Sequence, residues 1–122
     1  MDISLYRIVN AGEENEYLLL SVNKDCNLGK FLIYDTTYDQ DGNVSNKLPH
    51  LYRFPAMIIK KDNTPLIRLY TCRNYTTQEW LSPQGINTLI LSWRLQETIW
   101  NKEGDKANLI EISNESNIAF TK

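Results

Sequence analysis

The chain has 122 residues, which is enough for one domain and too few for two ordinary ones. Hydrophobic residues make up 42% and charged residues 23%, with only five Gly and four Pro, which excludes disordered, collagen-like and low-complexity chains. Thirteen basic and fifteen acidic residues give a net charge of −2, whereas a dedicated nucleic-acid binder usually has net basic character. We therefore expect one globular domain over residues 1–122.

Targeting and redox signals are sparse. No apolar run approaches the length that crosses a bilayer, and the first ten residues lack the apolar centre of a secretory signal. We expect a cytoplasmic protein if Met1 is the native start, and an extracellular one if the domain is cut from a longer secreted chain. Cys26 and Cys72 have neither metal-ligand nor CxxC spacing. We expect two partly buried free thiols, with a disulfide in an oxidising compartment as the alternative.

Short runs rich in β-branched and aromatic residues, bounded by turn residues, recur along the whole chain. They predict nine strands, at residues 4–9, 16–22, 30–34, 51–54, 56–59, 66–71, 88–93, 106–112 and 117–120. The best helix candidate, residues 91–100, has no N-cap, no glycine stop and a β-favouring end. The pattern therefore predicts an all-β domain of about eight or nine strands, a sandwich or barrel with little or no helix.

Three segments share an order and spacing with a known family. They are E-Y-L-L-L at 16–20 followed by N-L-G-K-F-L-I at 27–33, L-Y-R-F-P at 51–55, and W-N-K-E-G-D-K-A-N-L at 100–109. Together they resemble the lamin tail domain over roughly residues 5–113. The resemblance implies an immunoglobulin-like antiparallel β-sandwich, a stand-alone bacterial relative, and a motif that serves packing rather than catalysis.

The motif residues also have plain physical roles. Trp100 has the size of a core residue, Gly104 suits the positive φ of a hairpin over residues 101–105, and Gly29 opens a strand. The residues expected inside the sandwich are Trp100, Leu109, Phe31, Leu19 and Phe54.

Residues suited to catalysis or metal binding occur without the partners that such chemistry needs. His50 is the one histidine, and no Gly-x-Ser-x-Gly elbow accompanies it, so we expect a partly exposed structural residue. Asp35, Asp39 and Asp41 fail the EF-hand spacing, and we expect a solvated turn there, with a looser ion site as the alternative. The acidic residues at 13–16 are expected to form a solvated rim. We therefore expect that the protein is not an enzyme and that it binds neither a cofactor nor a metal ion.

The two longest interruptions of the strand pattern, residues 36–50 and 73–87, carry aromatic residues. Tyr38 lies in the first, and Tyr75 and Trp80 lie in the second. Aromatic side chains on long loops of a rigid scaffold are typical of binding hot spots, with packing back over the end of the sandwich as the alternative. Tyr38, Tyr75 and Trp80 are our candidate binding residues.

The predicted function is a non-catalytic interaction module that binds a protein partner through its end loops, in an oligomeric state that the sequence leaves open. A nucleic-acid-binding module is the first alternative, which the net charge of −2 disfavours. It would use the basic residues near one hairpin, namely Arg53, Lys60, Lys61, Arg68 and Arg73. The second alternative is an accessory domain of a larger secreted or surface hydrolase.

Overall fold

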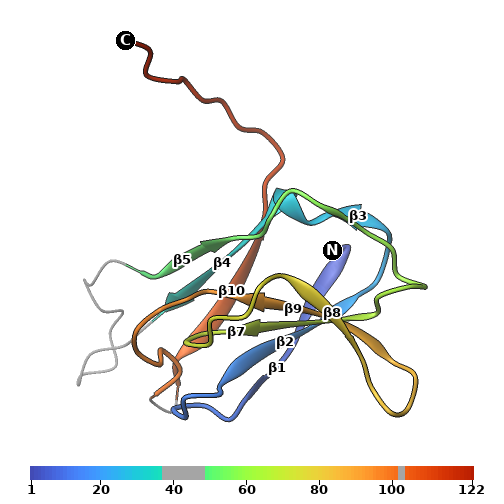
Figure 1. Cartoon of the computed structure of the whole chain (residues 1–122). Helices are drawn as coiled ribbons and strands as arrows, with labels where there is room; N and C mark the ends of the chain where they lie inside the picture. The colour runs from blue at the N-terminus through green and yellow to red at the C-terminus, as the bar shows by residue number, and fades with distance from the viewer. Residues whose placement is uncertain (37–48, 102–103) are drawn as a thin grey trace.

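The architecture is all-β, as predicted (Figure 1). A computed structural model describes residues 1–36, 49–101 and 104–122, and this part of the chain contains ten strands and one 3-10 turn. The strands are β1 (Ile3–Val9), β2 (Tyr17–Val22), β3 (Cys26–Asn27), β4 (Phe31–Thr36), β5 (Leu51–Arg53), β6 (Ile58–Ile59), β7 (Leu66–Tyr70), β8 (Gln78–Leu81), β9 (Asn87–Ser92) and β10 (Lys106–Glu111). The 3-10 turn, η1 (Leu28–Lys30), joins β3 to β4.

The larger sheet has the strand order β1-β2-β7-β9-β8. Its pairs are antiparallel except β7 with β9, which run parallel, so the expectation of a wholly antiparallel sandwich is wrong for this pair. The reason lies in residues 73–87, which contain the strand β8 rather than only a loop. The chain reverses after β7, runs back as β8 along the sheet edge, and reverses again so that β9 lies between them.

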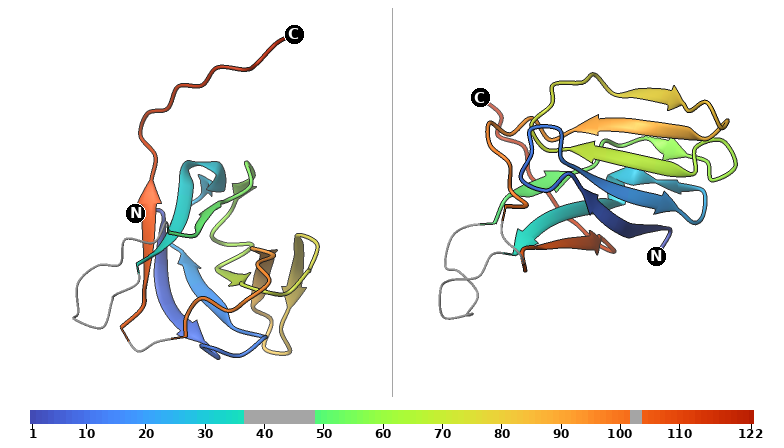
Figure 2. Two further views of the ribbon diagram at one scale, coloured as in Figure 1. Left: turned by 90° about the vertical axis from the view of Figure 1, so that its left-hand side faces the viewer. Right: turned by 90° about the horizontal axis from the view of Figure 1, so that it is seen from below.

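The second layer is smaller. It consists of the sheet β10-β4-β5 and the short pair β3-β6, all antiparallel (Figure 2). The edge strands β1 and β10 lie side by side, which closes one side of the sandwich. The other edge strand of the large sheet, β8, has β9 as its one partner strand among the described residues.

The core lies between the two layers and draws on both. Alternate residues of β2, β4 and β7 point inward, as the two-residue period of a strand requires. The members of the core, all 8% exposed or less, are Ile3, Leu18, Leu20, Val22, Cys26, Leu28, Phe31, Ile33, Phe54, Ile59, Ile67, Leu69, Leu89 and Leu91. Phe31 and Phe54 are therefore buried as predicted, and so is Trp100 at 3% exposed.

Two of the predicted core residues differ from expectation. Leu19 points to the outer face of the large sheet, because its neighbours Leu18 and Leu20 occupy the inward positions of β2. Leu109 is half-buried and packs against the edge of the core.

Two glycines of the motif take the roles that their residue type suggests. Gly104 has a φ of 97°, in the region that only glycine adopts readily. Gly29 lies in η1, where an added Cβ would meet the Ala56 Cα at 3.0 Å, so the turn packs too closely on the chain for a side chain. The remainder of the predicted hairpin at residues 102–103 lies outside the described residues.

Two further segments test the sequence prediction, which is confirmed for the first and wrong for the second. The helix candidate at residues 91–100 is the end of β9 followed by irregular chain. The predicted strand at residues 117–120 is extended chain outside any sheet, with Ile118 and Phe120 more than 90% exposed. No helix among the described residues is long and apolar enough to cross a membrane. Cys26 and Cys72 are free, and Cys26 is buried, as expected.

Tyr52 provides a test of packing at the β5 edge of the core. Its ring packs edge-on against Phe54 and lies near Trp93, and burial raises its pKa to about 12 while Arg94 opposes the rise. The folded state therefore holds the phenol proton more tightly than the unfolded state does, with an ordinary value of about 10. Its contribution to stability is complete below about pH 10 and is lost as the pH rises through about 12.

When tyrosinate absorbance is followed as the pH rises, we expect one of the seven tyrosines, Tyr52, to ionise last. The Tyr52→Phe variant should lack that late step. Denaturant unfolding at several alkaline pH values should show less loss of stability in Tyr52→Phe than in the parent. A late step that persists in Tyr52→Phe would contradict this assignment.

Candidate functional site

The exposed aromatic residues of β8 and of the chain before it lie on the outer face of the large sheet. Trp80 belongs to β8 and is 44% exposed, and Tyr75 precedes that strand and is 36% exposed. Both are thus accessible, but Trp80 stands on a strand rather than on the long end loop that the sequence suggested. Tyr38, the third candidate, lies outside the described residues, so the structure does not place it beside the other two.

Arg68 is the centre of this outer face. Its guanidinium carbon lies 4.6 Å from the ring centroid of Tyr17 and 5.2 Å from that of Trp80. Its Nη1 donates to the Tyr70 hydroxyl at 3.1 Å. Cation–π contacts of this geometry favour a guanidinium between rings, so the arginine is held in one place rather than moving freely in solvent.

The tyrosines continue the cluster on one side of Arg68. Tyr17 and Tyr70 have ring centroids 4.9 Å apart, and Tyr70 meets Tyr75 edge-on at 5.0 Å. The Tyr75 backbone N–H donates to the Ser92 hydroxyl, which ties the segment before β8 to the sheet. We call Tyr17, Arg68, Tyr70, Tyr75 and Trp80 the aromatic–arginine face.

Sequence reasoning identified Tyr75 and Trp80 as candidate binding residues and Arg68 as one of the basic residues near a hairpin, but it missed Tyr17 and Tyr70. The signal was available, because both are out of phase with the buried residues Leu18 and Leu69 beside them. Their meeting also required the β2–β7 register, which pairs Tyr17 directly with Tyr70.

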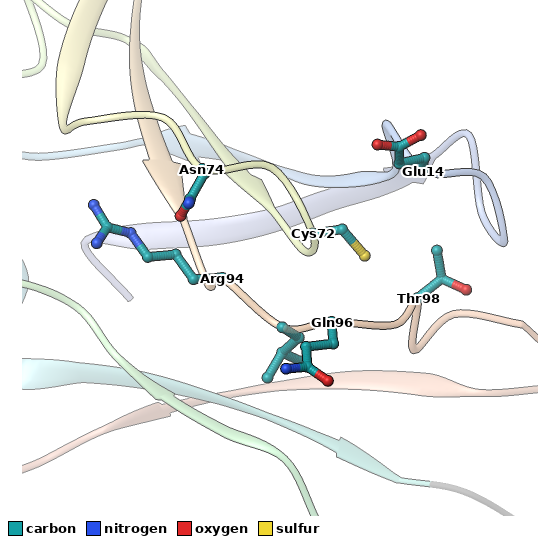
Figure 3. A pocket seen from close by; sticks show the side chains of 7 residues that line it. Glu14, Cys72, Asn74, Arg94, Gln96 and Thr98 are labelled. Carbon is teal, nitrogen blue, oxygen red and sulfur yellow. The ribbon is translucent and has the colours of Figure 1, made fainter.

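A cleft of about 540 Å³ opens at the end of the sheet where β7 and β9 finish (Figure 3). In Figure 3 Arg94 and Glu14 stand on opposite sides of this cleft, with Cys72 between them. Burial and nearby carboxylates, Glu16 first among them, raise the pKa of the Cys72 thiol above its ordinary value. A thiol with a raised pKa is a poor nucleophile at neutral pH, which argues against thiolate catalysis in this cleft.

His50 pairs with Asp35 where the chain enters β5. One carboxylate oxygen of Asp35 accepts the His50 backbone N–H at 2.6 Å, and the other lies 3.1 Å from the ring Nδ1. The pair ties the start of β5 to the end of β4. Asp35 is only 4% exposed, so the predicted solvated turn is wrong for this residue. Among the described residues no hydroxyl or thiol hydrogen-bonds to His50, so the pair lacks the nucleophile of a triad.

Metal binding receives no positive indication in the part of the chain that the structure describes. No group of three or more His, Cys, Asp or Glu side chains converges there. Asp39 and Asp41, which the sequence placed near Asp35, lie outside the described residues.

Glu16 is a further residue that sequence reasoning placed wrongly. It is fully buried rather than part of a solvated rim. Its Oε1 accepts the Gly12 N–H at 2.8 Å and its Oε2 accepts the Ile99 N–H at 3.0 Å. The carboxylate thus joins the β1–β2 turn to the segment that carries Trp100, a structural role with both oxygens occupied.

Comparison with protein-family models finds no match, and comparison with curated proteins finds none either. What the fold and the surface define is a β-sandwich with an aromatic–arginine face on its larger sheet.

Proposed function

We propose that this protein is a non-catalytic interaction module that binds a protein partner through the aromatic–arginine face. The observation that carries the proposal is Trp80, 44% exposed and stacked on Arg68. Trp, Tyr and Arg are the residues enriched at binding hot spots. A sheet presents them in fixed positions, so little conformational entropy is lost when a partner docks.

The lamin-tail type of module is part of the same proposal. Three motif residues have the packing roles that such a motif would need: Trp100 is buried, Gly104 has a positive φ, and Gly29 lies against Ala56. In this interpretation the motif maintains the sandwich, and the surface that binds a partner is separate from it.

The reactive groups in the described part of the chain have structural surroundings, which supports a binding role. The thiol of Cys72 has a raised pKa, and the imidazole of His50 is engaged by Asp35. Each group has chemistry of its own, but neither has a partner among the described residues that would make it a nucleophile–base pair.

Nucleic acid is the weaker candidate, because three of the five basic side chains near the hairpin are engaged elsewhere. Arg53 forms a bidentate pair with Glu115 at 3.0 and 3.2 Å, and the Lys60 ammonium lies 4.0 Å from Asp25. Arg68 lies among aromatic rings on the outer face of the large sheet. These groups do not form the continuous basic surface that displaces counterions from a phosphate backbone.

The proposal is tested by Trp80→Ala in a pull-down from a lysate of the native host. We expect a captured protein to be lost or strongly reduced, since truncating a hot-spot aromatic typically costs about 2 kcal/mol or more. The thermal midpoint should change little, because Trp80 is 44% exposed. Quantitative mass spectrometry of the captured proteins is the measurement.

Phe120→Ala is the matched control, because it removes an exposed aromatic ring, 91% accessible, from the C-terminal segment instead of the sheet. A partner that is captured equally by the parent, Trp80→Ala and Phe120→Ala would remove the support for this face as the binding surface.

A further inference from the structure

The strand register arranges the outer face of the large sheet in transverse rows. The central row crosses all five strands and contains Arg7, Leu19, Arg68, Ile90 and Gln78. The row on one side contains Val9, Tyr17, Tyr70 and Ser92, and the row on the other contains Ser4, Ser21, Leu66, Thr88 and Trp80.

These rows contain two arginines and not one Asp or Glu, although the whole chain has a net charge of −2. Glu79 does not alter this, because it lies between Gln78 and Trp80 in β8 and its side chain points to the opposite face of the sheet. It pairs with the inward residue Leu89, and its carboxylate accepts from the Thr64 hydroxyl at 2.8 Å. The three rows of this face are thus without an acidic side chain.

Neither arginine is neutralised by an ion pair in the part of the chain that the structure describes. Arg68 contacts two rings and one hydroxyl, and Arg7 lies over the Tyr6 ring at 5.8 Å. A guanidinium has five N–H donors in a planar fork that matches a carboxylate. Arg68 donates one of these N–H groups to Tyr70, so the others can still bind an anionic group. The rings of Tyr17 and Trp80 beside it exclude part of the water, which strengthens such an ion pair.

The apolar side chains of this face determine which groups of a ligand can bind beside its anionic group. Trp80 is 44% exposed, and two partly buried leucines neighbour Arg68: Leu19 opposite it on β2 and Leu66 two residues before it on β7. Contacts with apolar side chains are therefore available within one strand spacing of the charge. A ligand that places a carboxylate on Arg68 can bury aliphatic or aromatic groups beside it.

We propose that the outer face of the large sheet binds an acidic segment of a protein partner, in which carboxylates alternate with apolar side chains. This inference rests on the proposed function and gives the chemistry of its partner. Charge complementarity carries it: two unpaired arginines on a face without acids meet the carboxylates, and Trp80, Leu19 and Leu66 meet the apolar side chains.

A single-stranded nucleic acid fits this face less well. Sequence-tolerant strand binding needs several free ring faces, on which successive bases stack. Here Tyr70 is 9% exposed and meets Tyr75 edge-on, so the tyrosines pack on one another and do not offer their faces to bases. Trp80 is the most exposed ring of this cluster, but Arg68 already lies over it, and two arginines match few phosphates.

The test uses three labelled probes with the full chain and fluorescence anisotropy. They are a short peptide of alternating Glu and Leu with one Tyr, the same peptide with Gln in place of Glu, and an oligo-dT of similar length. We expect the acidic peptide to bind about tenfold more tightly than the Gln peptide near 50 mM salt, and to lose much of that preference near 500 mM salt. We expect the oligonucleotide to bind no better than the Gln peptide.

Arg68→Gln should weaken the acidic peptide several-fold and leave the Gln peptide unchanged. Arg7→Gln should act in the same direction and keeps the test decisive if loss of the ring contacts of Arg68 disturbs the fold. Lys61→Gln is the matched control, because it removes an equal charge from an exposed position off this face.

Equal binding of the two peptides, no acidic-peptide binding up to about 1 mM, or tighter binding of oligo-dT would overturn the inference. The proposed function would survive each of these results if Trp80→Ala still lost a captured protein partner. It would fall, independently, if that partner were retained.

Discussion

Replacing Trp100 by alanine should lower the free energy of unfolding by about 3–5 kcal/mol, the usual cost of truncating a buried aromatic residue. Trp100 is 3% exposed, and its ring meets that of Trp93 edge-on with centroids 6.4 Å apart. The substitution leaves a void beside Trp93 that the surrounding sheets cannot fully close. Thermal unfolding should shift downward by roughly 10 °C or more, and denaturant unfolding should show the loss at an unchanged slope.

Trp80→Ala is the matched control for this prediction, because it removes the same side chain from an exposed position. It should change the free energy of unfolding by well under half as much as Trp100→Ala does. Equal thermal midpoints for the two variants would contradict the placement of Trp100 in the core.

Glu16→Ala is expected to be the second severe substitution. It removes a fully buried carboxylate that accepts two backbone N–H groups, that of Ile99 in a buried hydrogen bond and that of Gly12 in a partly buried one. A buried donor left without a partner costs about 1–3 kcal/mol, so two would cost about 2–6 kcal/mol. Because Gly12 is exposed, we expect a loss in the lower half of that range in the free energy of unfolding. Chemical denaturation followed by tryptophan fluorescence measures this loss.

Two further variants separate the hydrogen bonds from the acidic charge itself. Glu13→Ala removes an exposed carboxylate from the same turn and should change the stability by less than about 0.5 kcal/mol. Glu16→Gln keeps one acceptor oxygen in place and should fall between the two alanine variants. A Glu16→Ala protein as stable as Glu13→Ala would show that the carboxylate does not join the turn to the Trp100 segment.

A large loss of stability in each of the single variants Glu16→Ala and Trp100→Ala would raise the question whether the two residues form one structural unit. The Ile99 N–H that Glu16 accepts lies directly before Trp100 in the chain. Because neighbouring residues share this connection, the double variant should lose less stability than the sum of the single losses. That non-additivity, measured in a double-mutant cycle, would indicate that the carboxylate positions the tryptophan.

The limits of sequence reasoning are clearest at residues 68–87. The strand predicted at residues 66–71 is present as β7, whose alternation buries Ile67 and Leu69 and turns Arg68 outward. It did not predict β8, since the four residues Gln78–Leu81 are all exposed and have no apolar-polar alternation to detect. The exposed edge strand β8 is held by its backbone hydrogen bonds to β9. Backbone pairing of this kind does not require a particular pattern of side chains, so the sequence of β8 shows little sign of it.

The sequence alone determined that this chain forms an all-β domain with Phe31, Phe54 and Trp100 inside, because strand period, turn residues and residue size are local properties. Period-two phase would also have placed Glu16 inward with Leu18 and Leu20, had its charge not suggested solvent. Only the tertiary structure decided which outward residues meet. Tyr17, Arg68 and Trp80 come from three strands, and strand order and register, which are set by contacts distant in sequence, bring them onto one face.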